Sequence, residues 1–575
     1  MKKLYENLFY LNDLNNLKSN TSILSKDLHD CYSKSFINYK KLKNLYKNNS
    51  NLSLFGKQKI LLEEIIEKDR IQKIYNYLIL EKLCGLQNNN LKLNLIIFEK
   101  NLDIETYFIL NNKGILKRFK LNFLSIIFNL IYKNLLFIFC FFKIFLLPEI
   151  TLINLKKTIK PPKKKFSFAF NLDYDALNFS RRDFRFRVIE NNFKLKCLNV
   201  IRYQHKLKNY YVLKKKLYKK KNYLILNDVY SYFNINSFLN KFYSKFSLER
   251  FNYLKIVNAS NCKVVLKCNI ESNAWNVFYE LFLVKNFISV MTHSELVEQY
   301  FQNRFSDKTF FVYLSSNDFY SNLRIQNNNI PDNLQYSYLN YDFLICDKFS
   351  KKFLMHDKNS FKKFLNFGNL NFNFLRSLKY KKNNFKDKKV LIFYDNSYGF
   401  NGVCTSEQYL EYLNFILNFM KKNNKIFFFL KIKDGNIDKN NKTQSIRKII
   451  QNIKSLKNYT KNIKFENNYK LSKYSFINIC LPFSSSINEN ILENKKTLIM
   501  DVSKYYINQK KHLYNKLKIV FYDFTRLEKE IKNNYSKTLI ENKKSINSKI
   551  INKEIGNYND KFLYKKFVKT INLFK

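Results

Sequence analysis

The chain of 575 residues is long enough for two or three domains, and its composition, 46% hydrophobic and 17% aromatic, excludes an intrinsically disordered protein. Its formal net charge of +57 suits nucleic acid or an anionic membrane, but the lysines are spread along the whole chain, and lysines on solvated faces need no partner. Nine cysteines without a CxxC pair and five dispersed histidines argue against a disulfide framework and a zinc site, and favour a reducing compartment.

The first 120 residues are polar, helix-prone and without a recognisable catalytic motif. In the helical region 1–92, residues 60–83 repeat apolar side chains with helical spacing, which predicts an amphipathic helix. Residues 93–99 are a candidate first strand, in a segment 93–120 that ends in basic residues. We expect no cleavable signal sequence, because polar side chains interrupt the first apolar cluster.

Residues 121–148 form the most hydrophobic segment. Lys133 and Lys143 divide it into apolar pieces that are short for crossing a bilayer, and basic residues flank it on both sides. This pattern favours a helix or a shallow helical hairpin that lies in a membrane interface, with its lysines toward the lipid headgroups. Two alternatives stay open: a true membrane span, and a pair of buried core helices.

From residue 166 onward, short strand-like runs alternate with helix-like stretches. Such alternation is typical of βα units, so residues 166–349 are predicted to form a Rossmann-like domain with a largely parallel sheet. A capping-box pattern at Thr292 and Glu295 precedes a predicted helix 296–305. Residues 350–388 are less regular and are assigned to an interdomain linker. The predicted strands are 185–189, 197–203, 223–226, 263–266, 287–291, 309–314 and 342–346.

A second α/β series occupies residues 389–534 and is predicted to be another Rossmann-like domain. The tail 535–575 is lysine-rich, has helical patches and shows no readable chemistry. The predicted strands of this domain are 390–394, 426–432, 463–465, 474–481, 497–501 and 518–522, and its predicted helices are 405–422, 446–456 and 526–534.

One loop of the second domain follows strand 390–394 and contains Asn396, Ser397, Gly399 and Gly402. In a chain with only eight glycines, two in one loop indicate backbone positions that need them. At the end of the next strand, Lys431 and Lys433 alternate, so that one ammonium group can point at a bound phosphate. The plainer alternative is two lysines on an exposed edge.

The stretch after strand 474–481 is a serine turn that opens into a predicted helix. Ser484, Ser485 and Ser486 follow Pro482, and Ser486 and Glu489 have the S-x-x-E spacing of a capping box. A helix N-terminus binds anions, and in a parallel sheet all three loops meet at one edge. The sequence therefore predicts a pyrophosphate site with no metal and no cofactor; a well-capped helix without a ligand is the alternative. Neither G-x-x-x-x-G-K-[ST] nor G-x-G-x-x-G occurs there, which disfavours a P-loop ATPase and a dinucleotide oxidoreductase.

The order of these parts resembles glycosyltransferases of the two-Rossmann-domain type (GT-B), in particular those of bacterial surface-polysaccharide biosynthesis. The resemblance spans about residues 166–534 and is one of pattern more than of invariant motifs. It is carried by FYELFLVKNFISVMTHSELVEQYF (278–301), TFFVYLSSNDFYSN (309–322), YLNYDFLICDKFSKKFL (338–354), FLNFGNL (364–370), VLIFYDNS (390–397), FFFLKIKDG (427–435), INICLPFSSSINENILENKKTLIMD (477–501) and VFYDFTRLEKEI (520–531).

The resemblance implies two lobes facing across a cleft, with a nucleotide-sugar donor on the second. It matches the serines with the loop that faces the donor diphosphate, and Lys431 with the basic residue that ends the lysine-bearing strand. Glu489 matches the acidic position that holds the donor ribose or sugar, an interpretation that competes with helix capping. The scarcity of glycine around these loops departs from the family pattern.

A catalytic base is expected from the first domain. His293 and Glu295 follow a predicted strand and are the best-placed candidates. Asp173, Asp175 and Asp342 are weaker ones. Each has a structural alternative, such as capping for Glu295 and strand entry for Asp342.

The leading hypothesis is a glycosyltransferase on the cytoplasmic face of a membrane that extends a lipid-linked glycan acceptor. The first alternative is an RNA-binding or ribosomal protein of an AT-biased organelle or symbiont, which would use its positive charge on nucleic acid. The second alternative is a non-catalytic scaffold with the glycosyltransferase fold. If the leading hypothesis is right, a nucleotide sugar should protect the second domain from heat or protease; the RNA-binding hypothesis does not predict such protection.

Overall fold

The computed structural model of the chain describes most of both predicted domains and much of the helical region. The described residues are 25–46, 59–86, 103–121, 123–154, 166–173, 197–202, 223–226, 247–290, 296–313, 338–355, 359–368, 370, 389–399, 402–432, 444–460, 471, 475–482, 484–508, 510, 512–537, 549–551 and 562–574. The predicted strands 93–99, 185–189 and 463–465 and the capping box at 292–295 lie outside them.

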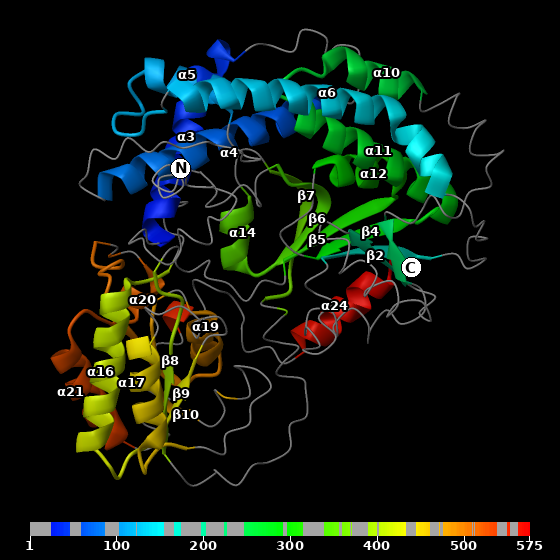
Figure 1. The fold of residues 1–575 in the computed structure, drawn as a ribbon. Helices are drawn as coiled ribbons and strands as arrows, with labels where there is room; N and C mark the ends of the chain where they lie inside the picture. Colours follow the sequence, from blue (N-terminus) through cyan, green and yellow to red (C-terminus); the bar gives the residue numbers. More distant parts are fainter. Residues whose placement is uncertain are drawn as a thin grey trace.

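The N-terminal region is a layer of helices that packs on the helices covering the first sheet (Figure 1). The predicted helix 60–83 is confirmed as α4, which packs against α3 around a core of tyrosines and aliphatic residues. The hydrophobic segment is one continuous helix, α6, and not a hairpin. The elements are α3 (Ser25–Leu42), η2 (Lys43–Leu45), α4 (Lys59–Leu86), α5 (Ile104–Asn112) and α6 (Phe123–Asn154).

The first sheet has seven strands in the order β3-β2-β1-β4-β5-β6-β7, and every pair is parallel. Helices α11 and α12 pack over it, with Trp275 fully buried in their core. The strands are β1 (Phe168–Asp173), β2 (Cys197–Arg202), β3 (Tyr223–Ile225), β4 (Asn286–Val290), β5 (Lys308–Val312), β6 (Asn340–Cys346) and β7 (Ser360–Asn366). The helices are α10 (Ser247–Ile256), α11 (Cys262–Phe282), α12 (Leu296–Phe305) and α14 (Lys348–Leu354).

Two predictions for this region are corrected. The run 263–266, expected to be a strand, is the first turn of helix α11; a short apolar run fits either structure, and here the helical pattern continues for 21 residues. Residues 360–366, assigned to the linker, form the edge strand β7. Because its side chains are exposed or half-buried, β7 lacks the apolar run that marks the interior strands.

The second sheet has five parallel strands in the order β12-β11-β10-β8-β9. The prediction of two α/β units with parallel sheets is therefore confirmed. The strands are β8 (Val390–Tyr394), β9 (Phe427–Lys431), β10 (Ser475–Cys480), β11 (Lys496–Met500) and β12 (Val520–Phe521). The helices are α16 (Ser406–Lys422), α17 (Gln444–Ser455), α19 (Ser485–Leu492), α20 (Leu513–Lys516) and α21 (Phe524–Tyr535).

Two features join the units. One hydrophobic cluster contains Phe311 and Leu344 of the first sheet together with Ile392 and Ile499 of the second. In addition, helix α24 (Leu563–Asn572) returns to the first sheet after the second is complete, as Figure 1 shows. Just beyond this helix, the ring of Phe574 lies 5.2 Å from that of Phe310, and its carbonyl accepts a 2.7 Å hydrogen bond from the side chain of Asn286.

Candidate functional site

The carboxyl edge of the second sheet has a topological switch point between β8 and β10. From β8 the chain continues to β9 on one side, and later to β10 on the other. The register places Tyr394 of β8 opposite both Lys431 of β9 and Cys480 of β10. The loops that follow these three strands therefore start at one edge, which is where open α/β sheets bind ligands.

The loop after β8 is tied to the loop after β10. The Asn396 side chain is buried, donates a 2.7 Å hydrogen bond to the Pro482 carbonyl and accepts one of 2.8 Å from the Ser397 backbone N–H. Asn396 therefore holds the two loops together across the switch point. The direct donor contact that the sequence predicts for Asn396 stays a prediction.

The two glycines of this loop have the predicted backbone requirement. Gly399 has a φ of +76°, and a Cβ on Gly402 would lie 2.5 Å from the Tyr398 backbone. However, the N–H groups of Gly399, Gly402 and Val403 donate to carbonyls within the loop itself. The loop is thus a closed turn, and the centre of the Tyr398 ring lies 4.4 Å from that of Tyr409, on which it stacks.

Helix α19 begins earlier than the sequence suggested. Its N-cap is Ser484, which makes no side-chain capping hydrogen bond, and Ser486 lies inside the first turn and is buried. The predicted capping box of Ser486 and Glu489 is therefore wrong. Three serines in a row offer several possible N-cap positions, and the helix begins after the first of them. Thr405 and Gln408, by contrast, form both bonds of a capping box at the start of α16.

Glu489 does not cap α19, and one oxygen of its carboxylate makes no hydrogen bond within the protein. The residue is partly exposed, but its Oε2 atom is shielded from solvent and accepts no hydrogen bond. Burial raises the pKa of Glu489 from 4.5 to about 7, although the nearby Lys431 ammonium lowers it. The Lys431 ammonium at the end of β9 and the Glu489 carboxylate on α19 therefore interact electrostatically across the switch point.

The structure adds polar residues around α19 that the sequence did not single out. The hydroxyl of Tyr514 donates a 2.8 Å hydrogen bond to Asn488 of α19. Beside it, His512 accepts a hydrogen bond from the Tyr514 backbone N–H, and burial lowers the pKa of His512 to about 3. Its imidazole therefore stays neutral at physiological pH. Tyr514 and Asn488 are 26 positions apart in the sequence and meet only in the folded chain, so no local motif predicts their contact.

The first sheet has its own switch point, between β1 and β4. Asp173 is the last residue of β1 and therefore lies at this edge. Asp342 lies near the start of β6, away from it, and its carboxylate pairs with Lys362 at 2.6 Å; burial would raise the pKa of Asp342, but Lys362 and Thr309 lower it. Asp342 is thus a strand-entry residue. The remaining candidates His293, Glu295, Asp175 and Lys433 lie outside the described residues.

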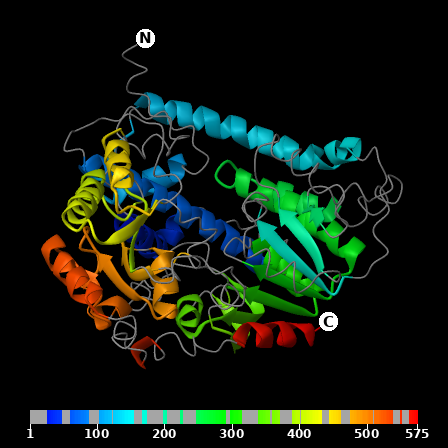
Figure 2. The ribbon, with the colours of Figure 1, turned by 90° about the horizontal axis from the view of Figure 1, so that it is seen from below.

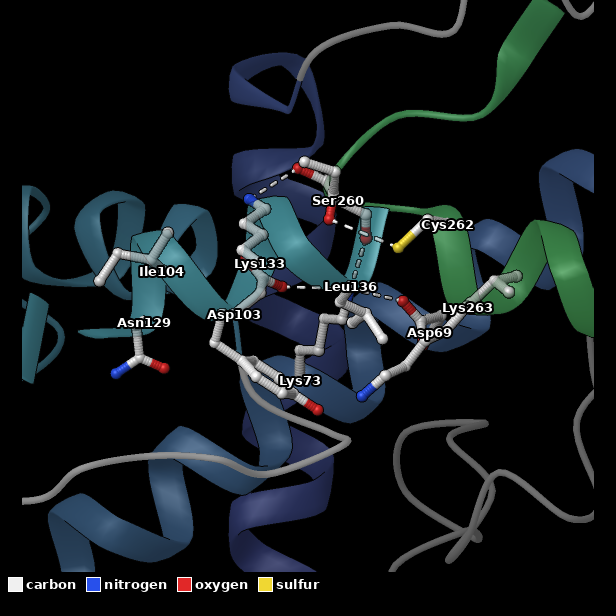
Figure 3. Close-up of a pocket in the computed structure, with 13 residues that line it drawn as sticks. Asp69, Lys73, Asp103, Ile104, Asn129, Lys133, Leu136, Ser260, Cys262 and Lys263 are labelled. Atoms are coloured by element: carbon white, nitrogen blue, oxygen red, sulfur yellow. Dashed lines mark hydrogen bonds and ion pairs between the residues drawn. The ribbon is translucent and has the colours of Figure 1, made fainter. Parts of the chain in front are cut away.

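A small pocket of about 50 Å³ lies elsewhere, among α4, α5, α6 and the start of α11 (Figure 3). Lys73 pairs there with Asp69 at 2.7 Å and with Asp103 at 3.2 Å, and it donates to the Ser260 carbonyl. Burial would lower the pKa of Lys73, but the two carboxylates raise it. Because Asp103 also caps α5, we interpret this network as an anchor between helices.

No family model and no curated protein matches the sequence. Solved structures show a weak likeness. The Staphylococcus aureus MnaA–UDP complex has a TM-score of 0.41 and 11% identity, covering 72% of this chain and 97% of its own. UDP-GlcNAc 2-epimerase from Neisseria meningitidis, bound to UDP-GlcNAc, has a TM-score of 0.38 and 11% identity, and the match covers 71% of this chain and 100% of the epimerase chain. A glycosyltransferase from Rickettsia africae has a TM-score of 0.36 and 12% identity, and the match covers 72% of this chain and 99% of the glycosyltransferase chain. At these scores the fold assignment depends on the chain's own two sheets.

The buried carboxylate of Glu489 predicts a pH-dependent stability. Between pH 4.5 and about 7 the folded state keeps a proton that the unfolded state loses, so the free energy of unfolding should fall as pH rises through this window. We expect a loss of roughly 1–3 kcal/mol, which Glu489→Gln should abolish. Calorimetry at pH 5 and pH 8 measures it, with Glu411→Gln on the exposed face of α16 as the control. Equal pH dependence in wild type and Glu489→Gln would contradict this.

The ion network at Lys73 predicts a strong destabilisation when its cation is removed. Lys73→Met leaves the Asp103 carboxylate buried without its principal counter-charge and should cost about 3–5 kcal/mol of unfolding free energy. Adding Asp103→Asn should recover part of this loss, because asparagine still caps α5 and no charge remains buried. Urea unfolding followed by circular dichroism tests both. A double variant no more stable than Lys73→Met would disprove the anchoring role.

Proposed function

We propose that this chain is a glycosyltransferase that binds a nucleotide-sugar donor at the carboxyl edge of the second sheet and transfers the sugar to a lipid-linked glycan. The observation that carries the proposal is the shielded, unpartnered Oε2 of Glu489 beside Lys431 at the switch point. A buried carboxylate destabilises a fold unless something pairs with it. A ligand hydroxyl would supply that partner.

The groups around Glu489 suit the parts of a nucleotide sugar. The carboxylate accepts hydrogen bonds from the ribose or sugar hydroxyls, and such charge-assisted bonds are among the strong ones. The Lys431 ammonium and the N-terminus of α19 attract the diphosphate. Asn396 keeps the loops after β8 and β10 at a fixed separation, so these groups are positioned before the ligand arrives.

In the proposed reaction, an acceptor hydroxyl oxygen forms a bond to the anomeric carbon of the donor sugar. The bond from that carbon to the diphosphate breaks, and the leaving nucleoside diphosphate takes the bonding electrons. Lys431 and the helix N-terminus would stabilise the negative charge that develops on it. A base at the edge of the first sheet would accept the hydroxyl proton; His293, Glu295 and Asp173 are its candidates. We place this reaction at the cytoplasmic face of a membrane.

The test is thermal stabilisation of the full chain by a panel of nucleotide sugars, nucleoside diphosphates and RNA at two salt concentrations. A donor at a hundred times its dissociation constant should stabilise the protein by about 2.7 kcal/mol. Lys431→Ala should weaken binding by roughly ten- to a hundredfold, the equivalent of one charge-assisted hydrogen bond. Lys422→Ala, at the exposed end of α16, is the matched control and should bind as wild type does.

Three results would overturn the proposal. Stabilisation by RNA alone, falling steeply with salt, would favour the nucleic-acid alternative. Donor binding without turnover of any acceptor would favour the scaffold. Equal weakening by Lys422→Ala and Lys431→Ala would mean that the effect is one of net charge and not of the site.

A further inference from the structure

We propose that the outer face of helix α6 binds the surface of an anionic lipid bilayer, with the helix axis in the plane of the membrane. Figures 1 and 2 show α6 as a long helix at the outer edge of the molecule. Its apolar stretch Phe123–Phe145 has a mean hydropathy of 1.9, yet only 11% of it is buried. This assignment uses no residue of the proposed donor site and is independent of it.

The outer side of α6 is far more apolar than the outer side of a helix on the surface of a soluble protein. Ser125 and Lys133 lie on the side that packs against the protein, together with apolar residues such as Cys140 and Ile144, while large apolar side chains face outward. In the described part of the chain, half of the exposed large hydrophobic side chains belong to this one helix. They are Phe123, Leu124, Ile127, Phe128, Leu130, Ile131, Leu135, Ile138, Phe139, Phe141, Phe142 and Phe145.

Of the two lysines of α6, one is directed inward and the other lies beside an exposed ring of the outer face. Lys133 points inward and donates a 3.0 Å hydrogen bond to the Ser260 hydroxyl, next to the pocket of Figure 3. Lys143 is half-buried, and its ammonium lies 4.9 Å from the centre of the Phe139 ring. In the sequence these lysines divide the apolar segment; on the helix surface they do not. An apolar face of this length, interrupted only by the exposed Asn134 among its described residues, is a typical mark of an interaction surface.

The segment before α6 is basic and has a fixed path. Lys113, Lys117, Arg118 and Lys120 are exposed there, and the carboxylate of Glu81 accepts the backbone N–H groups of residues 117–119. A basic cluster beside an apolar helix face complements anionic lipid headgroups. This charge is the reason to choose a lipid surface over a second copy of this chain, which would bring the same positive charge.

The packing of α6 favours an orientation in the membrane plane. The stretch is long enough to cross a bilayer, but its inner side packs on α5, α10 and α11. A spanning orientation would bring these helices and the ion pairs of the Lys73 network into hydrocarbon, which is costly. When it lies flat, α6 buries its outer apolar side chains in lipid and keeps its inner side on the protein.

The experiment is co-sedimentation of the full chain with vesicles of phosphatidylcholine, alone or mixed with phosphatidylglycerol. Wild type should bind the anionic vesicles, less so in high salt, and alkaline carbonate should release it. The variant Ile131→Ser/Leu135→Ser/Phe142→Ser should bind at least tenfold more weakly. These side chains are 51%, 61% and 55% exposed, so the fold should survive their loss. The control Ile507→Ser/Phe562→Ser/Leu573→Ser removes apolar groups that are 49%, 60% and 78% exposed and lie elsewhere, and should bind normally.

Other results would overturn the inference. Failure of wild type to bind either vesicle would exclude a lipid surface. A dimer that dissociates in the α6 variant, without vesicle binding, would assign the face to a second copy of this chain. Resistance of the bound protein to alkaline carbonate would show a spanning helix instead of one in the membrane plane.

Discussion

The alignment of the carboxyl end of β8 with the carboxyl ends of both neighbouring strands is the constraint on which the candidate site depends. Tyr394 lies opposite Lys431 on one side and Cys480 on the other, so three loops start at the same level of the sheet. Backbone hydrogen bonds extend this alignment by one residue, from Asp395 to the Lys431 carbonyl and from Leu481 to the Tyr394 carbonyl. A shift of one residue in either pairing would reverse which side chains face α19.

The interior strands were predictable from the sequence, and the edge strand was not. Strands β8 and β10 are buried at every position, and such a strand is a continuous apolar run in any sequence. Strand β7 contains two lysines and has one solvated side, so its sequence does not differ from that of a linker. The strand predicted at 263–266 was wrong for a different reason: its three apolar residues fit a strand and a helix equally well.

For the candidate donor site, the sequence predicted which residues lie at the sheet edge, but not the contacts that these residues make. Lys431, the serine turn and Glu489 could be chosen because they follow predicted strands. The link from Asn396 to Pro482 and the interaction of Glu489 with Lys431 join residues more than 50 positions apart, which no local pattern contains. The same holds for α6. Hydropathy identifies an apolar helix, but only packing shows which of its sides remains uncovered.

The return of α24 to the first sheet has a consequence for biosynthesis. The rings of Phe310 and Phe343 are covered by Phe574, which lies 264 positions after Phe310 along the chain. A nascent chain that has emerged from the ribosome only as far as the second sheet therefore exposes these two aromatic rings. Such surfaces are recognised by chaperones and promote aggregation of folding intermediates. Maturation of the first unit thus ends after that of the second, although its strands are synthesised first.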